Sequence, residues 1–159
     1  MKHYFEPRSN VAWETIKIYC PVTGVITRIE EEWAGTKIEI ASSDYPAFRF
    51  TIFHVNTLVE HHLNDKVTAG DQLGTHIGSL TMSDISVIVN DPSKQGKMIS
   101  YFEVITDAVF KEFSDRGVDK REDMIITKAA RDADPLSCSG ETFSSTGSLE
   151  NWVNLIETL

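Results

Sequence analysis

The chain has 159 residues, of which 41% are hydrophobic and 25% charged, and its formal net charge is −9. This composition is typical of a globular protein, and the length suits one domain. The sequence has no cluster of Lys and Arg, which argues against a nucleic-acid partner. No apolar run approaches the ~20 residues that span a bilayer. The polar N-terminus shows no apolar core of a signal peptide.

The first two thirds of the chain predict β structure. Several segments alternate apolar and polar residues, or are rich in the aromatic and β-branched residues that strands favour. The predicted strands cover 16–20, 22–29, 37–40, 48–55, 84–89 and 98–104. Short strands separated by Gly and Pro turns are typical of a barrel or a sandwich.

The periodicity changes after residue 104. Apolar residues recur at helical spacing over 106–113, where Thr106 suits an N-cap and Gly117 a stop. A second helix is predicted within 127–133, because Pro135 then ends it.

The remaining C-terminal residues predict little regular structure. The polar stretch 137–148 is interpreted as a loop with a turn at 139–141, and 152–156 as a short strand. We therefore expect a single domain over 1–159, with a β core at about 14–104. A helical and loop extension follows at about 105–159.

Two glycine-containing turns are the most specific local signals. They lie in the segments 20–26 and 66–74, and glycine suits such turns because positive φ costs it little. Together the two segments resemble the turns of the barrel-sandwich hybrid. The predicted fold class is therefore mostly β, a barrel-sandwich hybrid of the duplicated hybrid type with a small helical C-terminal extension.

The order of four segments resembles that of lysostaphin-type zinc metallopeptidases. In chain order these segments are 24–26, 52–55, 67–74 and 99–104, and the resemblance covers roughly 16–104. The resemblance implies the duplicated hybrid fold and a ligand cleft. It also implies that His54 matches a catalytic residue, one that helps to polarise the substrate or stabilise the transition state.

The positions of the family's zinc ligands depart from its pattern. Ile99 and Tyr101 stand where the family has the two histidines of "H-x-H". The upstream "H-x-x-x-D" is missing, and its nearest counterpart is His3 with Glu6. A hydrolytic zinc needs three protein ligands and an open position. The resemblance therefore implies a lost peptidase centre and no cofactor.

A relocated zinc site is the alternative. His76 could approach His54 across the sheet, with Asp84 or Glu103 as a third ligand; a hydrogen-bonded cleft histidine is the simpler interpretation of His76. The neighbours His61 and His62 are interpreted as loop residues, because adjacent strand residues point to opposite faces.

Tyr101, Glu103 and Arg131 are further candidate binding residues. Tyr101 could bind an oxyanion. Arg131 could pair with Glu103 or Asp107 in a structural role, or recognise a carboxylate at a pocket through its bidentate guanidinium group.

Three functions remain open from the sequence. The first is a non-catalytic binding or interaction domain for peptide or cell-wall-like ligands, in an extracytoplasmic setting that only the resemblance suggests. The second is a metal-dependent hydrolase with zinc ligands around His54 and His76. The third is a small-molecule carrier, although no lysine has the flanking residues of a modified carrier lysine. Cys20 and Cys138 could form one disulfide or remain separate thiols.

Overall fold

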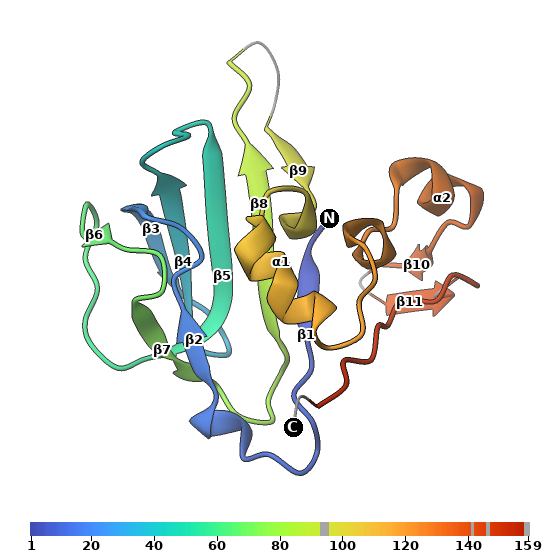
Figure 1. Cartoon of the computed structure of the whole chain (residues 1–159), viewed down its shortest axis with the longest axis horizontal. Helices are drawn as coiled ribbons and strands as arrows, with labels where there is room; N and C mark the ends of the chain where they lie inside the picture. The colour runs from blue at the N-terminus through green and yellow to red at the C-terminus, as the bar shows by residue number, and fades with distance from the viewer. Residues whose placement is uncertain (93–95, 141, 146, 158–159) are drawn as a thin grey trace. The chain divides into compact units, whose positions relative to one another are not determined.

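The computed structural model describes residues 1–92, 96–140, 142–145 and 147–157 (Figure 1). The chain divides into two compact units, Met1–Tyr101 and Phe102–Leu159. The predicted border between β core and extension, at about 104, lies close to this division. That both units belong to a single domain stays a prediction.

The first unit is an antiparallel β sheet, as the alternating segments predict. It contains, besides a short 3-10 turn at Trp13–Thr15, the strands β1 (His3–Phe5), β2 (Lys17–Tyr19), β3 (Gly24–Glu31), β4 (Thr36–Ser42), β5 (Phe48–Thr57), β6 (Lys66–Val67), β7 (Gln72–His76), β8 (Ser83–Val89) and β9 (Lys97–Ile99). The strand order is β1-β8-β5-β4-β3-β6, β7 joins β5 to β2, and β9 pairs with β8. The mostly β fold class is confirmed.

One face of this sheet carries the hydrophobic core. In β4, buried and half-buried residues alternate along the strand, so that Ile38 and Ile40 point inward. The buried residues of this core are Cys20, Ile26, Ile38, Ile40, Ile52, Val55, Val67 and Leu73. The alternate positions of β4, which include Lys37 and Glu39, point to the opposite face.

The two predicted glycine turns lie side by side. Gly24 pairs with Val67 across β3 and β6, and the amide of Gly70 donates to the carbonyl of Cys20 at 2.9 Å. A Cβ atom on Gly24 would lie 2.1 Å from the carbonyl oxygen of Ala41, so the close pairing of β3 with β4 requires glycine there. Both turns thus belong to one compact β unit.

The predicted strand 98–104 is only partly correct. β9 ends at Ile99, and Tyr101–Glu103 form a 3-10 turn. The reason lies in β8. β9 pairs with residues 87–89 of β8, while β1, which sequence reasoning missed, pairs with residues 83–85. β9 therefore cannot continue along β8, because β1 occupies the next positions.

The second unit contains the two predicted helices, α1 (Asp107–Ser114) and α2 (Lys128–Ala133), and a 3-10 turn at Arg121–Met124. Each helix begins after a threonine whose hydroxyl accepts a backbone N–H, Thr106 for α1 and Thr127 for α2. Phe102 packs edge-to-face on Phe113 of α1, with ring centroids 4.9 Å apart.

Two C-terminal predictions are wrong. The polar stretch is not only loop, because β10 (Ser137–Ser139) and β11 (Thr142–Ser145) form a hairpin. Glycine at 140, with φ +62°, allows its tight turn, while residue 141 of the predicted turn lies outside the described residues. Residues 152–156 do not form a strand; the amide of Ile156 donates to the carbonyl of Arg116, which belongs to no strand.

The two cysteines are separate thiols. Cys20 is buried in the first unit and Cys138 is exposed in the second, and both are free. The disulfide alternative is therefore wrong, and burial raises the pKa of the Cys20 thiol. Among the described residues, no helix has the length and apolar character to cross a membrane.

Candidate functional site

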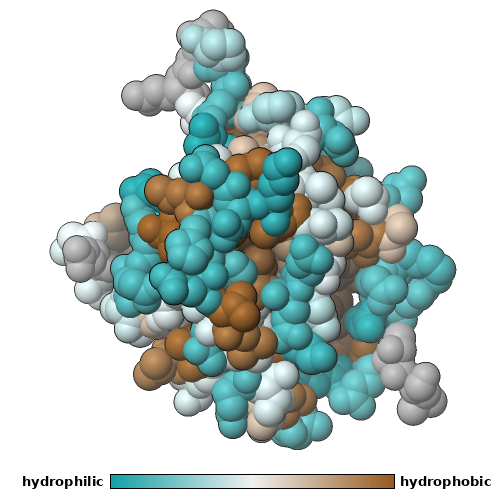
Figure 2. Space-filling model, turned by 90° about the vertical axis from the view of Figure 1, so that its left-hand side faces the viewer, coloured by the Kyte–Doolittle hydropathy of each residue, from teal (hydrophilic) through white to brown (hydrophobic). Residues whose placement is uncertain are grey.

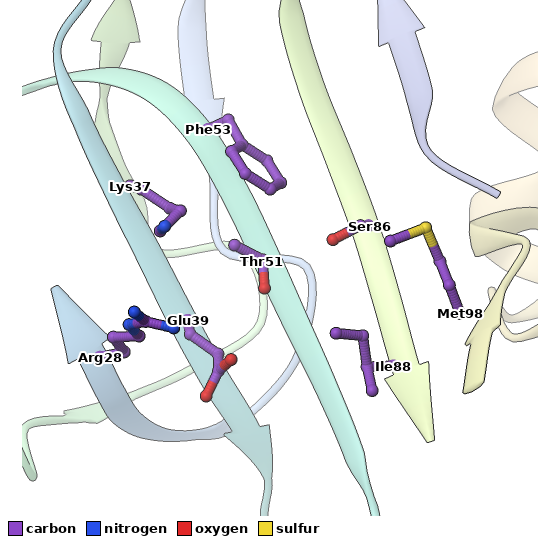
Figure 3. A pocket seen from close by; sticks show the side chains of 8 residues that line it. All are labelled: Arg28, Lys37, Glu39, Thr51, Phe53, Ser86, Ile88 and Met98. Atoms are coloured by element: carbon purple, nitrogen blue, oxygen red, sulfur yellow. The ribbon is translucent and has the colours of Figure 1, made fainter. Parts of the chain in front are cut away.

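A shallow groove lies on the polar face of the sheet (Figure 3). It encloses about 180 Å³ and is formed by alternate residues of adjacent strands. The register explains this, because Thr51 of β5 lies opposite Ser86 of β8, and Phe53 lies opposite Asp84. The lining residues are Arg28, Lys37, Glu39, Thr51, Phe53, Ser86, Ile88 and Met98.

Two hydroxyl groups form the floor of the groove. Thr51 is 6% exposed and Ser86 is 2% exposed. Neither hydroxyl is hydrogen-bonded to any residue that the structure describes, and Figure 3 shows both on facing strands at the groove. A hydroxyl both donates and accepts hydrogen bonds, so the floor can bind either kind of polar group.

The charged walls of the groove are balanced by neighbouring side chains. Lys37 forms an ion pair with Glu30, and Arg49 donates to Glu39 at 2.8 Å. The contact with Lys37 is the main reason why the pKa of the Glu30 carboxyl lies below its usual value. The groove is therefore polar without a strong excess of either charge.

His54 lies in a β-bulge at one end of the polar face. Thr36 pairs with Val55 and Ile38 with Ile52, so Phe53 and His54 together face the single residue Lys37. His54 accordingly has a left-handed backbone, with φ +59°, which is uncommon for a residue other than glycine. Such bulges redirect side chains and are frequent beside functional sites.

The imidazole of His54 is held between two carboxylates. Its Nδ1–H donates to the carbonyl of Ala34 at 2.9 Å, and Glu32 Oε2 lies 3.4 Å from the same nitrogen. Its Nε2 lies 3.7 Å from Oδ2 of Asp84. Trp33, in the turn between β3 and β4, lies beside the ring at a centroid distance of 5.6 Å.

Asp84 is a buried carboxylate, and its positively charged partner is the side chain of Lys2. Its side chain is 1% exposed, and Lys2 Nζ lies 3.0 Å from Oδ1. Burial raises the pKa of Asp84, and the ammonium group of Lys2 opposes that rise. Lys2 Nζ also lies 3.6 Å from the centre of the Phe53 ring, in a cation–π contact.

His76 belongs to the interior rather than to the groove. It lies opposite Val55 in the β5–β7 pair and is 1% exposed. Its Nδ1 accepts the backbone N–H of Gly78 at 3.1 Å, so Nε2 carries the proton of the neutral ring. Burial lowers the pKa of His76, and the nearby His54 lowers it further. The simpler interpretation, a hydrogen-bonded histidine, fits these contacts.

The predicted alternative zinc site does not fit this donor set. Glu32 and Asp84 approach opposite nitrogens of His54, Nδ1 already carries a proton, and Lys2 binds one oxygen of Asp84. Within the described ranges, no three His, Cys, Asp or Glu side chains are grouped to hold one ion. His3 does not join them, because its Nε2 lies 2.8 Å from Ser100 Oγ.

The other candidates have different surroundings. Tyr101 is half-buried, and burial raises its pKa, whereas Glu103 is exposed in the second unit. Arg131 donates to Asn151 at 2.8 Å, and Arg121 rather than Arg131 binds Asp107. The predicted pairing of Arg131 with Asp107 is therefore wrong.

Some apolar side chains are also exposed. Leu58, Val59 and Leu63, between β5 and β6, are each about 60% exposed. Figure 2 shows one face of the molecule, where hydrophobic residues occur in small groups among hydrophilic ones. The groove and the His54 bulge are therefore the better-defined candidate site.

Sequence reasoning found His54 and Asp84 but missed Lys2, Glu32, Thr51 and Ser86. Thr51 and Ser86 stand at alternate positions of predicted strands, which was a usable signal for a shared face. The sequence carries no comparable signal that Lys2 reaches Asp84.

Comparison with solved structures finds similar chains among peptidases. One is a protein described as glycyl-glycine endopeptidase LytM from Ruminococcus gnavus, 18% identical, with a TM-score of 0.42, covering 52% of this chain and 37% of that one. Another is the catalytic domain of the antimicrobial peptidase lysostaphin from Staphylococcus simulans, 18% identical, with a TM-score of 0.40, covering 52% and 62%. A solution structure of lysostaphin is 18% identical, with a TM-score of 0.41, covering 57% and 36%.

Each match spans less than two thirds of the other chain, and every TM-score is below 0.5, so no residue role is transferred from these proteins. No protein-family model matches the chain. No curated protein matches its sequence either.

Proposed function

We propose that the chain is a non-catalytic relative of the lysostaphin-type peptidases, with the duplicated hybrid architecture. It binds an extended peptide or a cell-wall-like ligand on the polar face of its sheet. The observation that carries the proposal is the groove over Thr51 and Ser86, two largely buried residues whose hydroxyls have no hydrogen-bond partner among the described residues. A polar ligand can therefore hydrogen-bond to these hydroxyls.

An extended peptide suits the chemistry of this groove. Its backbone presents N–H and C=O groups in alternation, and hydroxyl groups can pair with both. Phe53, Ile88 and Met98 supply apolar contacts for side chains. These features favour recognition of a chain over that of a compact anion.

Two features support binding without catalysis. Lys2 occupies one oxygen of the buried Asp84, where a metal would need an unpaired donor. Ile99 and Tyr101 stand at the family's "H-x-H" positions, and isoleucine has no donor atom. An extracytoplasmic setting is part of this proposal, and the family resemblance alone supports it.

The test is an NMR titration of the ¹⁵N-labelled chain with capped tetraalanine and, separately, capped tetraglycine. We expect at least one peptide to shift the backbone amide signals of Thr51, Ser86 and Ile88. The double variant Thr51→Val/Ser86→Ala should lose these shifts, whereas Ser43→Ala, at an exposed serine outside the groove, should keep them. Equal binding by the double variant would contradict the proposal.

A metal-dependent hydrolase with relocated ligands is the second candidate. The contact of His54 Nε2 with Asp84 Oδ2 at 3.7 Å brings two of its ligands together, but the third is missing among the described residues and Lys2 binds the other oxygen of Asp84. It predicts one zinc per purified chain, lost in His54→Ala, and peptide hydrolysis that a chelator stops. The binding-domain proposal predicts no zinc by elemental analysis and no hydrolysis.

A further inference from the structure

We infer that β1 is a replaceable occupant of the edge of β8, and that the natural ligand of this edge is an extended peptide carrying a lysine. The inference deepens the proposed function and rests on it. The binding position, called here the ammonium site, consists of the Asp84 carboxylate and the Phe53 ring, with His54 beside Asp84. Lys2 of the chain itself occupies this position.

The ammonium site is built for a primary amine. The carboxylate of Asp84 is almost fully buried, and an unpaired buried charge is strongly unfavourable. Lys2 Nζ lies 3.0 Å from that carboxylate and 3.6 Å from the centre of the Phe53 ring. The two contacts together select a cation on a flexible stem, because the ring face and the carboxylate both attract positive charge.

β1 holds this position by few backbone contacts. It has three residues, and its registered pairs are His3 with Ile85, Tyr4 with Asp84 and Phe5 with Ser83. Lys2 and Tyr4 lie on the groove side with Asp84, whereas His3 faces the other side and contacts Ser100. A peptide from another molecule can make the same backbone pairs by strand addition.

The edge of β8 is also a suitable place for a peptide strand to replace β1. β9 covers residues 87–89 of this edge, and residues 83–85 are left to β1. Because a competing lysine peptide would make the same contacts as β1, the fraction of chains in which it replaces β1 depends on the concentration of the peptide. An attached segment acts at an effective concentration on the order of 1 mM, so β1 suppresses binding by weaker or dilute peptides.

Charge complementarity favours a basic peptide over other occupants. The chain carries a net charge of −9, and Glu32 lies with Asp84 around His54. An acidic peptide would meet these carboxylates, and a peptide without a cation would leave Asp84 unpaired. The ligand class is therefore an extended peptide with lysine beside residues able to pair as a strand.

The test measures the binding of a fluorescent heptapeptide with the sequence of residues 1–7, labelled at its C-terminus, to the full chain. We expect Lys2→Met to bind this peptide about tenfold more tightly than the wild type, since the internal competitor has lost its ammonium contacts. Lys17→Met, which removes an exposed lysine of β2, should bind like the wild type. A peptide with norleucine in place of lysine should bind the Lys2→Met chain about tenfold more weakly.

A second variant keeps the test decisive if Lys2→Met folds poorly. Phe5 and Ser83 lie opposite each other, so Phe5→Cys/Ser83→Cys can lock β1 onto β8 with a disulfide. The oxidised chain should not bind the lysine peptide, and reduction should restore binding. Equal affinity of the wild type and Lys2→Met, equal affinity for both peptides, binding by the locked chain, or no binding to any chain would each overturn the inference. If the tetraalanine or tetraglycine titration still succeeds, only this inference fails and the proposed function stands.

Discussion

The two faces of the sheet in the first unit are stabilised in different ways. On one face, Ile38 and Ile40 are fully buried among other aliphatic side chains. On the other, Thr51 and Ser86 are almost as buried, yet their hydroxyls find no partner among the described residues. The first face is complete within the fold, whereas the second has unused hydrogen-bonding capacity. In the proposed function, the second face is the one that binds the ligand.

The largest expected effect tests the apolar face. Ile38→Ala should lower the free energy of unfolding by about 2 to 5 kcal/mol, because it removes buried methyl groups and leaves a cavity. Ser86→Ala, at a similar burial on the polar face, should change it by less than about 1 kcal/mol, since no hydrogen bond is lost. Urea denaturation monitored by circular dichroism measures both. Comparable losses in the two variants would mean that the faces do not differ in this way.

A smaller effect concerns His3, a buried polar residue on the side of β1 away from the groove. Burial lowers its pKa from the ordinary 6.5 to about 4. The folded state therefore binds this proton less well than the unfolded state. Above pH 6.5 the titration of His3 does not change the free energy of unfolding. As the pH drops toward 4, this titration lowers the free energy of unfolding by about 3 kcal/mol in total.

The measurement is a series of urea midpoints between pH 4 and 8, for the wild type and for His3→Gln. Glutamine can still bond to Ser100 but does not titrate in this range. The variant should therefore lose part of the decline at low pH. Parallel pH profiles would show that His3 is not the group responsible.

The smallest expected effect concerns the bulge at His54. Asparagine tolerates a left-handed backbone, whereas a β-branched residue does not. His54→Val should therefore be less stable than His54→Asn by about 1 to 2 kcal/mol, given the φ of +59°. Thermal unfolding of the two variants measures the difference. A more stable valine variant would place the backbone of residue 54 in the extended region.

The predictable part of this fold is the part that local patterns specify. The alternation around Ile38 and Ile40 identifies the apolar face, Thr106 identifies the start of the first helix, and Pro135 limits the end of the second. These signals lie within a few residues of what they predict. The two glycine turns likewise correctly predict a compact β unit.

The unpredicted part depends on register between distant segments. The contact of Lys2 with Asp84 joins residues more than eighty positions apart, and the three-residue strand β1 has no periodicity of its own. The bulge at His54 follows from the pairing of β4 with β5 rather than from the residues around it. Candidate residues can therefore be chosen from sequence, but their partners cannot.

The short outer strands have a consequence for association between molecules. β6 has two residues, and β1 and β9 have three each, so every one of these outer strands offers only a short row of backbone N–H and C=O groups. Sheets of different molecules pair edge to edge and aggregate most easily through long, flat outer strands. Such short edge strands disfavour edge-to-edge aggregation of the protein, even though the sheet itself is large.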